Sequence, residues 1–234
     1  ASMYGKEEPS SKPAAPAKPA AWSLIGTLNG TSWNADTDLS NTSGDIWMVR
    51  GVTVTASDEF KIRADHKWDT SVGGPEANSK STIDPTNPYD VFKPTLGTAF
   101  ATGDKNIQIG EAGKYDVTFD YANSKVLIAK HITAYSLIGE INGDSWTADV
   151  IMTKSGDVWT SPAVNITGGF KIRYDYSWDA ANTYGAADGF VPTIGTAFTA
   201  VQPGANITVP ASGNYKVSFN SSTKAVTITA VANP

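Results

Sequence analysis

Apolar and polar residues alternate along several short stretches of the chain, so that every second side chain is apolar. These stretches are 107–109, 115–119 and 126–128, and then 207–209, 215–219 and 226–228. A period of two is typical of half-buried β-strands, whereas no stretch shows a sustained helical stripe with a period of 3.6. Asn-Gly pairs at 29–30 and 142–143 add the signal of tight turns. The pattern therefore predicts an all-β protein of short antiparallel strands.

The same segments occur twice in the same order. WSLIGTLNGTSW (22–33) returns as YSLIGEINGDSW (135–146), FKIRADHKWD (60–69) as FKIRYDYSWD (170–179), and FKPTLGTAF (92–100) as FVPTIGTAF (190–198). Spacing holds apart from one insertion in the first copy, at 75–89. A period of about 110 residues is too long for a solenoid repeat and predicts duplicated domains.

Each copy has room for about seven short strands, which favours an immunoglobulin-like sandwich of two antiparallel β-sheets. We therefore expect two tandem modules, at 22–132 and 133–234. Residues 1–21 are assigned to a Pro/Ala-rich linker or tail, because each proline fixes φ and removes a hydrogen-bond donor. Residues 1–6 lack the pattern of a signal peptide, so we take the sequence to be that of a mature or trimmed chain.

Composition narrows the chemistry. Among 234 residues there is no cysteine, which excludes a disulfide scaffold, a cysteine-ligated zinc site and a thiol nucleophile. The 18 Lys and Arg residues against 23 Asp and Glu residues give a net charge of −5, without a basic run. Nucleic acid is therefore not an expected partner, because phosphate-backbone binding needs a basic surface. No apolar stretch approaches the roughly 20 residues of a membrane-spanning helix.

The repeated Phe-Lys-Ile-Arg segment is the first candidate for function. In a strand, Phe60 and Ile62 point to one face, so Lys61 and Arg63 share the other. Lys171 and Arg173 repeat this arrangement. Two cations on a solvent face can hold polar ligand groups, since Arg offers a rigid fork of donors and Lys a compact charge. A plain solvated strand face is the alternative.

Four tryptophans lie in loop-type sequence. Trp68 and Trp178 follow the Phe-Lys-Ile-Arg strands, and Trp33 and Trp146 follow the Asn-Gly turns. An indole offers a flat surface to the C–H face of a sugar, and covering it yields about 1–3 kcal/mol at about 25 cal/mol per Å². Lys, Arg and Asn side chains then bond the sugar hydroxyls. The alternative is that these indoles cap the core of their own module.

The string FKIRxDxxWD, followed by a Gly-bearing loop, resembles the core of starch-binding β-sandwich modules. The resemblance is to the SusE/SusF-type surface lipoproteins of bacterial starch-utilisation systems, and the segment SLIGxxNGxSWxAD is similar to them as well. SWDAANTYG (177–185) is also similar to a motif in accessory modules of amylopullulanases, whereas KWDTSVGG (67–74) lacks its tyrosine. The resemblance covers nearly all of 22–231.

This resemblance implies that each module binds starch or another α-1,4-glucan, as polymer or maltooligosaccharide, without cleaving it. The residues that it places at the glycan-binding sites are Trp33, Lys61, Arg63, Trp68 and Asn78 in the first module, with Tyr89 as a further contributor, and Trp146, Lys171, Arg173, Trp178, Asn182 and Tyr184 in the second. It also implies a place on the extracellular face of the outer membrane, through a lipid anchor upstream of this chain, near other glycan-uptake proteins. We expect a monomer.

Enzyme hypotheses find little support. His66 is replaced by Tyr176 in the second copy, and Asp69 and Asp179 supply one loop carboxylate per copy where a glycosidase needs two. Asp36-Thr37-Asp38 is faintly similar to a calcium loop, but the second copy does not repeat it. No catalytic residue, metal site or cofactor is expected. Tandem structural or protein-interaction domains, and a binder of a different glycan, remain the alternatives.

Overall fold

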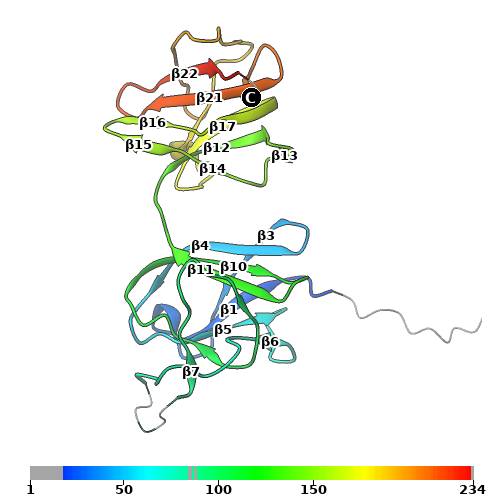
Figure 1. Ribbon diagram of the computed structural model, residues 1–234, viewed down its shortest axis with the longest axis vertical. Coiled ribbons are helices and arrows are strands. Elements are labelled where there is room, and N and C mark those ends of the chain that lie inside the picture. The colour runs from blue at the N-terminus through cyan, green and yellow to red at the C-terminus, as the bar shows by residue number, and fades with distance from the viewer. Residues whose placement is uncertain (1–17, 84–85, 87–88, 233–234) are drawn as a thin grey trace, which may run out of the picture. The chain divides into compact units, whose positions relative to one another are not determined.

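The computed structural model describes residues 18–83, 86 and 89–232. The chain divides into two compact units, on either side of the bond between Lys130 and His131. The described residues form strands and two short 3₁₀ turns, Leu28–Gly30 and Ala180–Asn182, with no α-helix (Figure 1). The expected all-β class is therefore confirmed. Within these residues no helix reaches the length and apolarity needed to cross a membrane.

The first unit has two sheets. One contains β1 (Trp22–Gly26), β2 (Asp36–Asp38), β5 (Phe60–Ala64), β6 (Ser71–Val72), β7 (Val91–Phe92) and β9 (Asn106–Ile107), in the order β2-β1-β5-β9-β7 with β6 also on β5. The other contains β3 (Ser40–Ser43), β4 (Ile46–Val54), β8 (Phe100–Ala101), β10 (Gly113–Asp120) and β11 (Lys125–Lys130), in the order β3-β4-β10-β11-β8. All pairs are antiparallel except β7 with β9.

Alternating apolar side chains of the two sheets form the core of this unit. The inward residues include Leu24, Phe60 and Ile62 from one sheet and Val117 and Phe119 from the other, all at most 2% exposed. Apolar side chains on the facing sides of two sheets remove each other from water, which is the main stabilisation of a sandwich. The strands with one buried face that the alternation in the sequence predicts are therefore present.

The second unit joins its strands into one continuous network. It contains β12 (Tyr135–Ile141), β13 (Asp144–Ser145), β14 (Val150–Ile151), β15 (Thr153–Ser155), β16 (Val158–Thr160), β17 (Val164–Tyr174), β18 (Thr183–Tyr184), β19 (Phe198–Thr199), β20 (Ile207–Thr208), β21 (Gly213–Asn220) and β22 (Ala225–Ala230). The long strand β17 pairs with β21 through 164–166 and with β12 through 166–174, so it belongs to both layers. The corresponding stretch of the first unit is divided between β4 and β5.

The insertion of the first copy lies against the edge strand β7. Ser79 forms a bridge with Val91, and the Ser81 hydroxyl donates a 2.6 Å hydrogen bond to the buried carboxylate of Glu59. Residues 84–85 and 87–88 of the insertion lie outside the described residues, as does most of the expected tail, 1–17.

Candidate functional site

The outer face of the β1–β5 pair carries the cations that the sequence singles out. Ser23 lies opposite Arg63 and Ile25 opposite Lys61 in the antiparallel register. Because Leu24 between them points into the core, these four side chains lie on the other face of the sheet. The register repeats in the second unit, where Ser136 pairs with Arg173 and Ile138 with Lys171.

Arg63 is held by an acidic residue of the neighbouring strand β2. Its Nε donates to Asp36 Oδ2 at 2.8 Å and its Nη2 to Asp36 Oδ1 at 2.5 Å, and Ser23 Oγ donates to the same carboxylate at 2.5 Å. Arg63 is only 9% exposed. The hydrogen bond from Arg63 lowers the pKa of Asp36, and the same bond raises the pKa of Arg63. This is a bidentate, charge-assisted pair.

The second unit repeats this pair. Arg173 Nε and Nη2 donate to Asp149 at 2.8 and 2.5 Å, and Ser136 Oγ donates to Asp149 at 2.6 Å. The expectation of two exposed cations per strand is therefore wrong for Arg63 and Arg173, which are buried and direct Nε and Nη2 at a neighbouring carboxylate. Asp36, considered as part of a calcium loop, is instead the partner of an arginine.

Each arginine also supports an indole. The guanidinium carbon Cζ of Arg63 lies 5.0 Å from the Trp68 ring centroid, and that of Arg173 lies 4.6 Å from the Trp178 centroid. A cation at this distance over a ring is an attractive cation–π contact. Both tryptophans remain 51% exposed. One part of each ring therefore rests on the protein while much of it faces solvent.

A second, half-buried indole lies beside each of these rings. The Trp33 and Trp68 centroids are 6.0 Å apart with an interplanar angle of 37°, and the Trp146 and Trp178 centroids are 6.0 Å apart at 39°. We call each pair an indole platform: Trp33 with Trp68, and Trp146 with Trp178. The structure thus brings together, in both units, the two tryptophans that the sequence assigns to one module's site.

Unusual backbone conformations place these rings. Trp33 and Trp146 have φ values of 61° and 63°, a left-handed region that large side chains rarely occupy. The amide of Trp33 donates to Gly26 O at 3.0 Å, and the amide of Trp146 to Gly139 O at 3.0 Å. A left-handed conformation of a large residue costs energy. Because both copies contain it, the surrounding structure must hold the two tryptophans in it.

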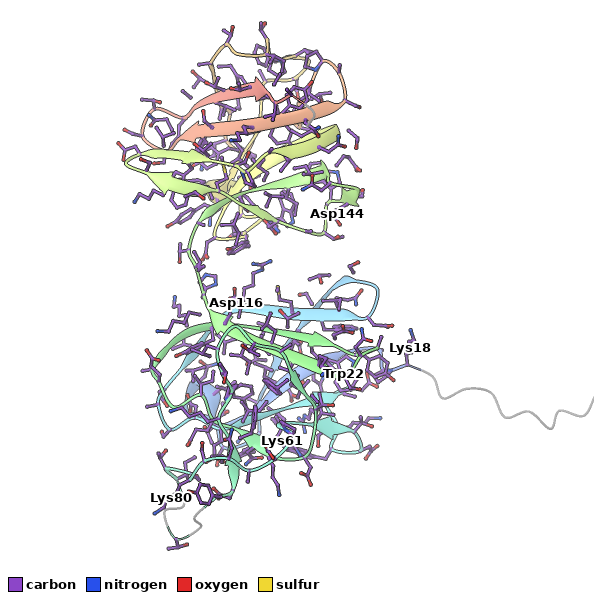
Figure 2. All side chains as sticks on the ribbon, in the orientation of Figure 1. Lys18, Trp22, Lys61, Lys80, Asp116 and Asp144 are labelled. Atoms are coloured by element: carbon purple, nitrogen blue, oxygen red, sulfur yellow. The ribbon has the colours of Figure 1, made fainter. Side chains whose placement is uncertain are left out.

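The two lysines of the candidate site differ. Lys171 Nζ donates to the backbone carbonyl of Gly204 at 2.7 Å. Lys61, labelled in Figure 2, has no such acceptor within the part of the chain that the structure describes. Both side chains are half-buried. An ammonium group is thus available to a ligand in the first unit and already engaged in the second.

Of the remaining predicted contacts, Asn78, Asn182 and Tyr184 bond or pack within their own unit, whereas Tyr89 is exposed. The side-chain amide of Asn78 forms two hydrogen bonds with the backbone of Lys93. Asn78 Nδ2 donates to Lys93 O at 3.0 Å, and Lys93 N donates to Asn78 Oδ1 at 2.7 Å. Asn182 Nδ2 donates to Tyr174 O at 3.3 Å. Tyr184 is 6% exposed and its ring centroid lies 5.1 Å from that of Phe219, so little of its ring is open to a ligand. Tyr89, in the insertion, is 68% exposed.

Sequence reasoning missed two buried residues on the outer face of the β1–β5 pair and its counterpart. Ile25 and Ile138 are at most 1% exposed, although they lie on the face opposite the core. The consecutive apolar residues Leu24-Ile25 and Leu137-Ile138 were the available signal, since a strand with both faces covered loses its alternation. The first unit also pairs His66 Nε2 with Asp38 Oδ1 at 2.6 Å, and this bond raises the pKa of His66. Residues 18–83, 86 and 89–232 include no cluster of three potential metal ligands.

Comparisons with known proteins add little to this geometry. No protein-family model matches the chain, and no curated protein matches it. Three solved chains match, among them SusF from Bacteroides thetaiotaomicron, with 16% sequence identity and a TM-score of 0.38. That match covers 92% of this chain and 49% of SusF, so the chain spans about half of its length. At this similarity the likeness carries no argument about function.

Proposed function

We propose that the protein is a non-catalytic binder of α-glucan, with one binding surface on each unit. The observation that carries the proposal is the indole platform, present twice with the same 6.0 Å spacing and nearly the same tilt. The resemblance of the sequence to starch-binding modules agrees with it.

A half-exposed indole fixed from below suits a sugar ring. The C–H face of a pyranose is apolar, so it gains free energy when it leaves water against the free part of Trp68 or Trp178. Because the arginine beneath each ring holds it in place, little side-chain entropy is lost on binding. Neutral sugars need no strong field, in accord with a net charge of only −5.

The tilt of the two rings favours a curved glycan. Rings inclined by 37° to 39° cannot both lie flush against one flat ribbon, such as a β-1,4-linked glucan. An α-1,4-linked glucan turns from one residue to the next, and successive sugars can follow the change of plane. This supports starch-type chains over cellulose-type chains as ligands.

Lys61 is the cation that we assign to hydroxyl binding in the first unit, because Arg63 is only 9% exposed and directs its Nε and Nη2 at Asp36. A shallow single site of this kind is expected to have a Kd of about 0.1–1 mM. Two tethered sites on one polymer raise the apparent affinity by up to about 100-fold where both can be engaged.

Affinity electrophoresis in amylopectin gels tests the proposal. The wild type should be retarded, and the double variant Trp68→Ala/Trp178→Ala should migrate as in gels without polysaccharide. Val191→Ala is the matched control, since Val191 is 56% exposed but belongs to neither platform. Equal mobility of the wild type with and without amylopectin contradicts the proposal, and gels with cellulose derivatives or other glucans separate it from binding of a different glycan.

A second candidate is a tandem structural or protein-interaction protein, in which the indoles only cap the sheet. It is favoured by the arginine under Trp68 and by the half-buried state of Trp33. Acrylamide quenching of tryptophan fluorescence distinguishes the two candidates. Protection by maltoheptaose supports glycan binding, whereas quenching that maltoheptaose leaves unchanged supports the capping role.

A location on the outer face of the outer membrane, contact with other glycan-uptake proteins, and a monomeric state also belong to this proposal. They rest on the sequence resemblance alone. Protease accessibility of the protein on intact cells tests the location, and sedimentation analysis tests the monomer.

A further inference from the structure

The first unit has a pocket away from its indole platform, at one end of the sandwich. Its volume is about 410 Å³, within the range of small-molecule sites of about 300–1,000 Å³. The residues that line it are Lys18, Pro19, Ala20, Trp22, Asn41, Gly44, Asp45, Trp47 and Tyr121. Because Trp22 belongs to one sheet and Trp47 to the other, the pocket opens between the two sheets. Two of these lining residues, Lys18 and Trp22, are labelled in Figure 2.

The aromatic residues provide flat apolar surface in this pocket. Trp22 is 2% exposed and packs against Tyr121 at 5.5 Å, so it forms the closed inner side. Trp47 and Tyr121 are half-buried and pack on the core from the other sheet. Aromatic walls of this kind cover the C–H face of a ring-shaped ligand.

Unused polar groups lie among these rings. Asn41 Nδ2 donates to Gly44 O at 2.9 Å and to Ile46 O at 3.1 Å, which orients the amide. Its Oδ1 atom and the hydroxyl of Tyr121 have no hydrogen-bond partner within residues 18–83, 86 and 89–232. An acceptor and a hydroxyl next to aromatic rings match a ligand that presents both C–H groups and hydroxyls.

The charged residues of the pocket neutralise each other. Lys18 Nζ lies 3.0 Å from Asp45 Oδ1, and the lysine side chain is 67% exposed. An exposed pair of this kind contributes little to stability, so the Lys18 side chain can move aside for a ligand. The backbone of the same wall stays in place, because the amides of Ala20 and Ala21 both donate to Asp65 Oδ1, at 2.9 and 3.0 Å. The pair leaves no net charge, which favours a neutral ligand over an anion or a cation.

The second unit has different side chains and a direct ring contact at the corresponding place. Tyr135, the counterpart of Trp22, packs directly against Trp159, the counterpart of Trp47, with ring centroids 5.3 Å apart. Lys154 Nζ lies 5.9 Å over the Trp159 ring, and Ser221 stands where the first unit has Tyr121. The pocket therefore depends on side chains of the first unit that the second unit does not share, although the two units have similar folds.

From this geometry we propose that the pocket is an additional binding site for a single neutral sugar ring, such as a glucose unit of an oligosaccharide. The inference extends the proposed function, because both concern saccharides, but it uses none of the platform residues. It gives the protein three saccharide sites, two shared by the units and one confined to the first.

The two variants that test the pocket copy the second unit. Asn41 faces Trp47 across β3 and β4 as Lys154 faces Trp159 across β15 and β16, so Asn41→Lys should cover the ring. Tyr121→Ser removes one aromatic wall and introduces the residue of the second unit. Thermal melts show whether each variant folds, and either variant alone suffices for the test.

Saturation-transfer difference NMR with maltose and glucose as probes measures the sites separately. In the background Trp68→Ala/Trp178→Ala, saccharide signals should persist and should fall at least five-fold when Asn41→Lys or Tyr121→Ser is added. Loss of every signal in the background, or persistence unaffected by both added variants, overturns the inference. Those results leave the proposed function intact if wild-type protein is still retarded by amylopectin and the background is not.

Discussion

Arg63 contacts Asp36 and Trp68 at the same time: its Nη2 lies 2.5 Å from Asp36 Oδ1, and its Cζ lies 5.0 Å from the Trp68 ring centroid. The bidentate ion pair fixes the plane of the guanidinium, and the fixed guanidinium in turn supports the indole. Arg173, Asp149 and Trp178 repeat the relationship. A buried ion pair thus serves as the base of an exposed aromatic surface.

The first prediction concerns this ion pair. Arg63→Gln leaves the carboxylate of Asp36 without its cation, and we expect a loss of about 3 kcal/mol in the free energy of unfolding of the first unit. Chemical denaturation followed by circular dichroism measures it. The double variant Arg63→Gln/Asp36→Asn should recover much of the loss, since it leaves no unpaired charge. A single variant as stable as the wild type contradicts the structural role of the pair.

The second prediction concerns the lysines. In the background Trp178→Ala, Lys61→Ala should weaken maltoheptaose binding about ten-fold, because a hydrogen bond from a charged donor contributes about 1.5 kcal/mol. In the background Trp68→Ala, Lys171→Ala should change the affinity much less, because Lys171 Nζ already donates to Gly204 O. Isothermal titration calorimetry measures both. Equal effects of the two substitutions contradict this difference between the units.

The third prediction concerns pH. The hydrogen bond that His66 donates to Asp38, followed by the charge of Asp38, raises the pKa of His66 above 6.5, with smaller effects of Asp36 and Arg63. A raised pKa stabilises the folded state fully below pH 6.5, and the contribution is lost as the pH rises through the folded-state value. The melting temperature of the wild type should therefore fall relative to that of His66→Gln as the pH rises above 6.5. A constant difference between the two proteins contradicts it.

At low pH the pH dependence of stability has the opposite sign, because the group concerned is a carboxylate with a lowered pKa. The pKa of Asp36 is lowered below 3.8, chiefly by the hydrogen bond from Arg63. Its contribution to stability is therefore present above pH 3.8 and is lost as the pH falls through the lower folded-state value. Asp36→Asn should remove this part of the acid sensitivity, measured by acid titration of the circular dichroism signal. Unchanged acid sensitivity in the variant contradicts the assignment.

The fourth prediction concerns two glycines near the first platform. A Cβ atom at Gly26 would lie 2.0 Å from Glu59 O, closer than any real contact, so Gly26→Ala should destabilise the unit by about 3 kcal/mol or more. Gly30 has open space but a φ of 70°, and Gly30→Ala should cost about 1 kcal/mol. Urea denaturation of both variants tests this order, and a smaller loss for Gly26→Ala contradicts it.

Much of the fold could be predicted from local sequence. Tyr115, Val117 and Phe119 alternate with polar residues, and they form a strand with one buried face as expected. The duplication also predicts that whatever Trp33 and Trp68 do, Trp146 and Trp178 do as well. The strand order could not be predicted, because nothing local in the sequence says which strands become neighbours.

The ion pair beneath the indole platform could not be predicted from the sequence either. Arg63 and Asp36 are 27 residues apart in sequence, and they meet only because β2 lies beside β1 in the folded sheet. Without knowledge of that register, the sequence alone indicates an exposed cation at Arg63 and a surface carboxylate at Asp36. The burial of Tyr184 is hidden for the same reason, since a Tyr-Gly pair after a loop does not reveal that β18 pairs with β17.

The left-handed backbone of Trp33 and Trp146 has a kinetic consequence. Because each ring is already oriented before anything binds, no loop has to close over a ligand or reopen to release it. If the platforms bind α-glucan as proposed, no ordering step delays association, and weak binding then means short dwell times. A long polymer would accordingly be released at one position and regained at the next.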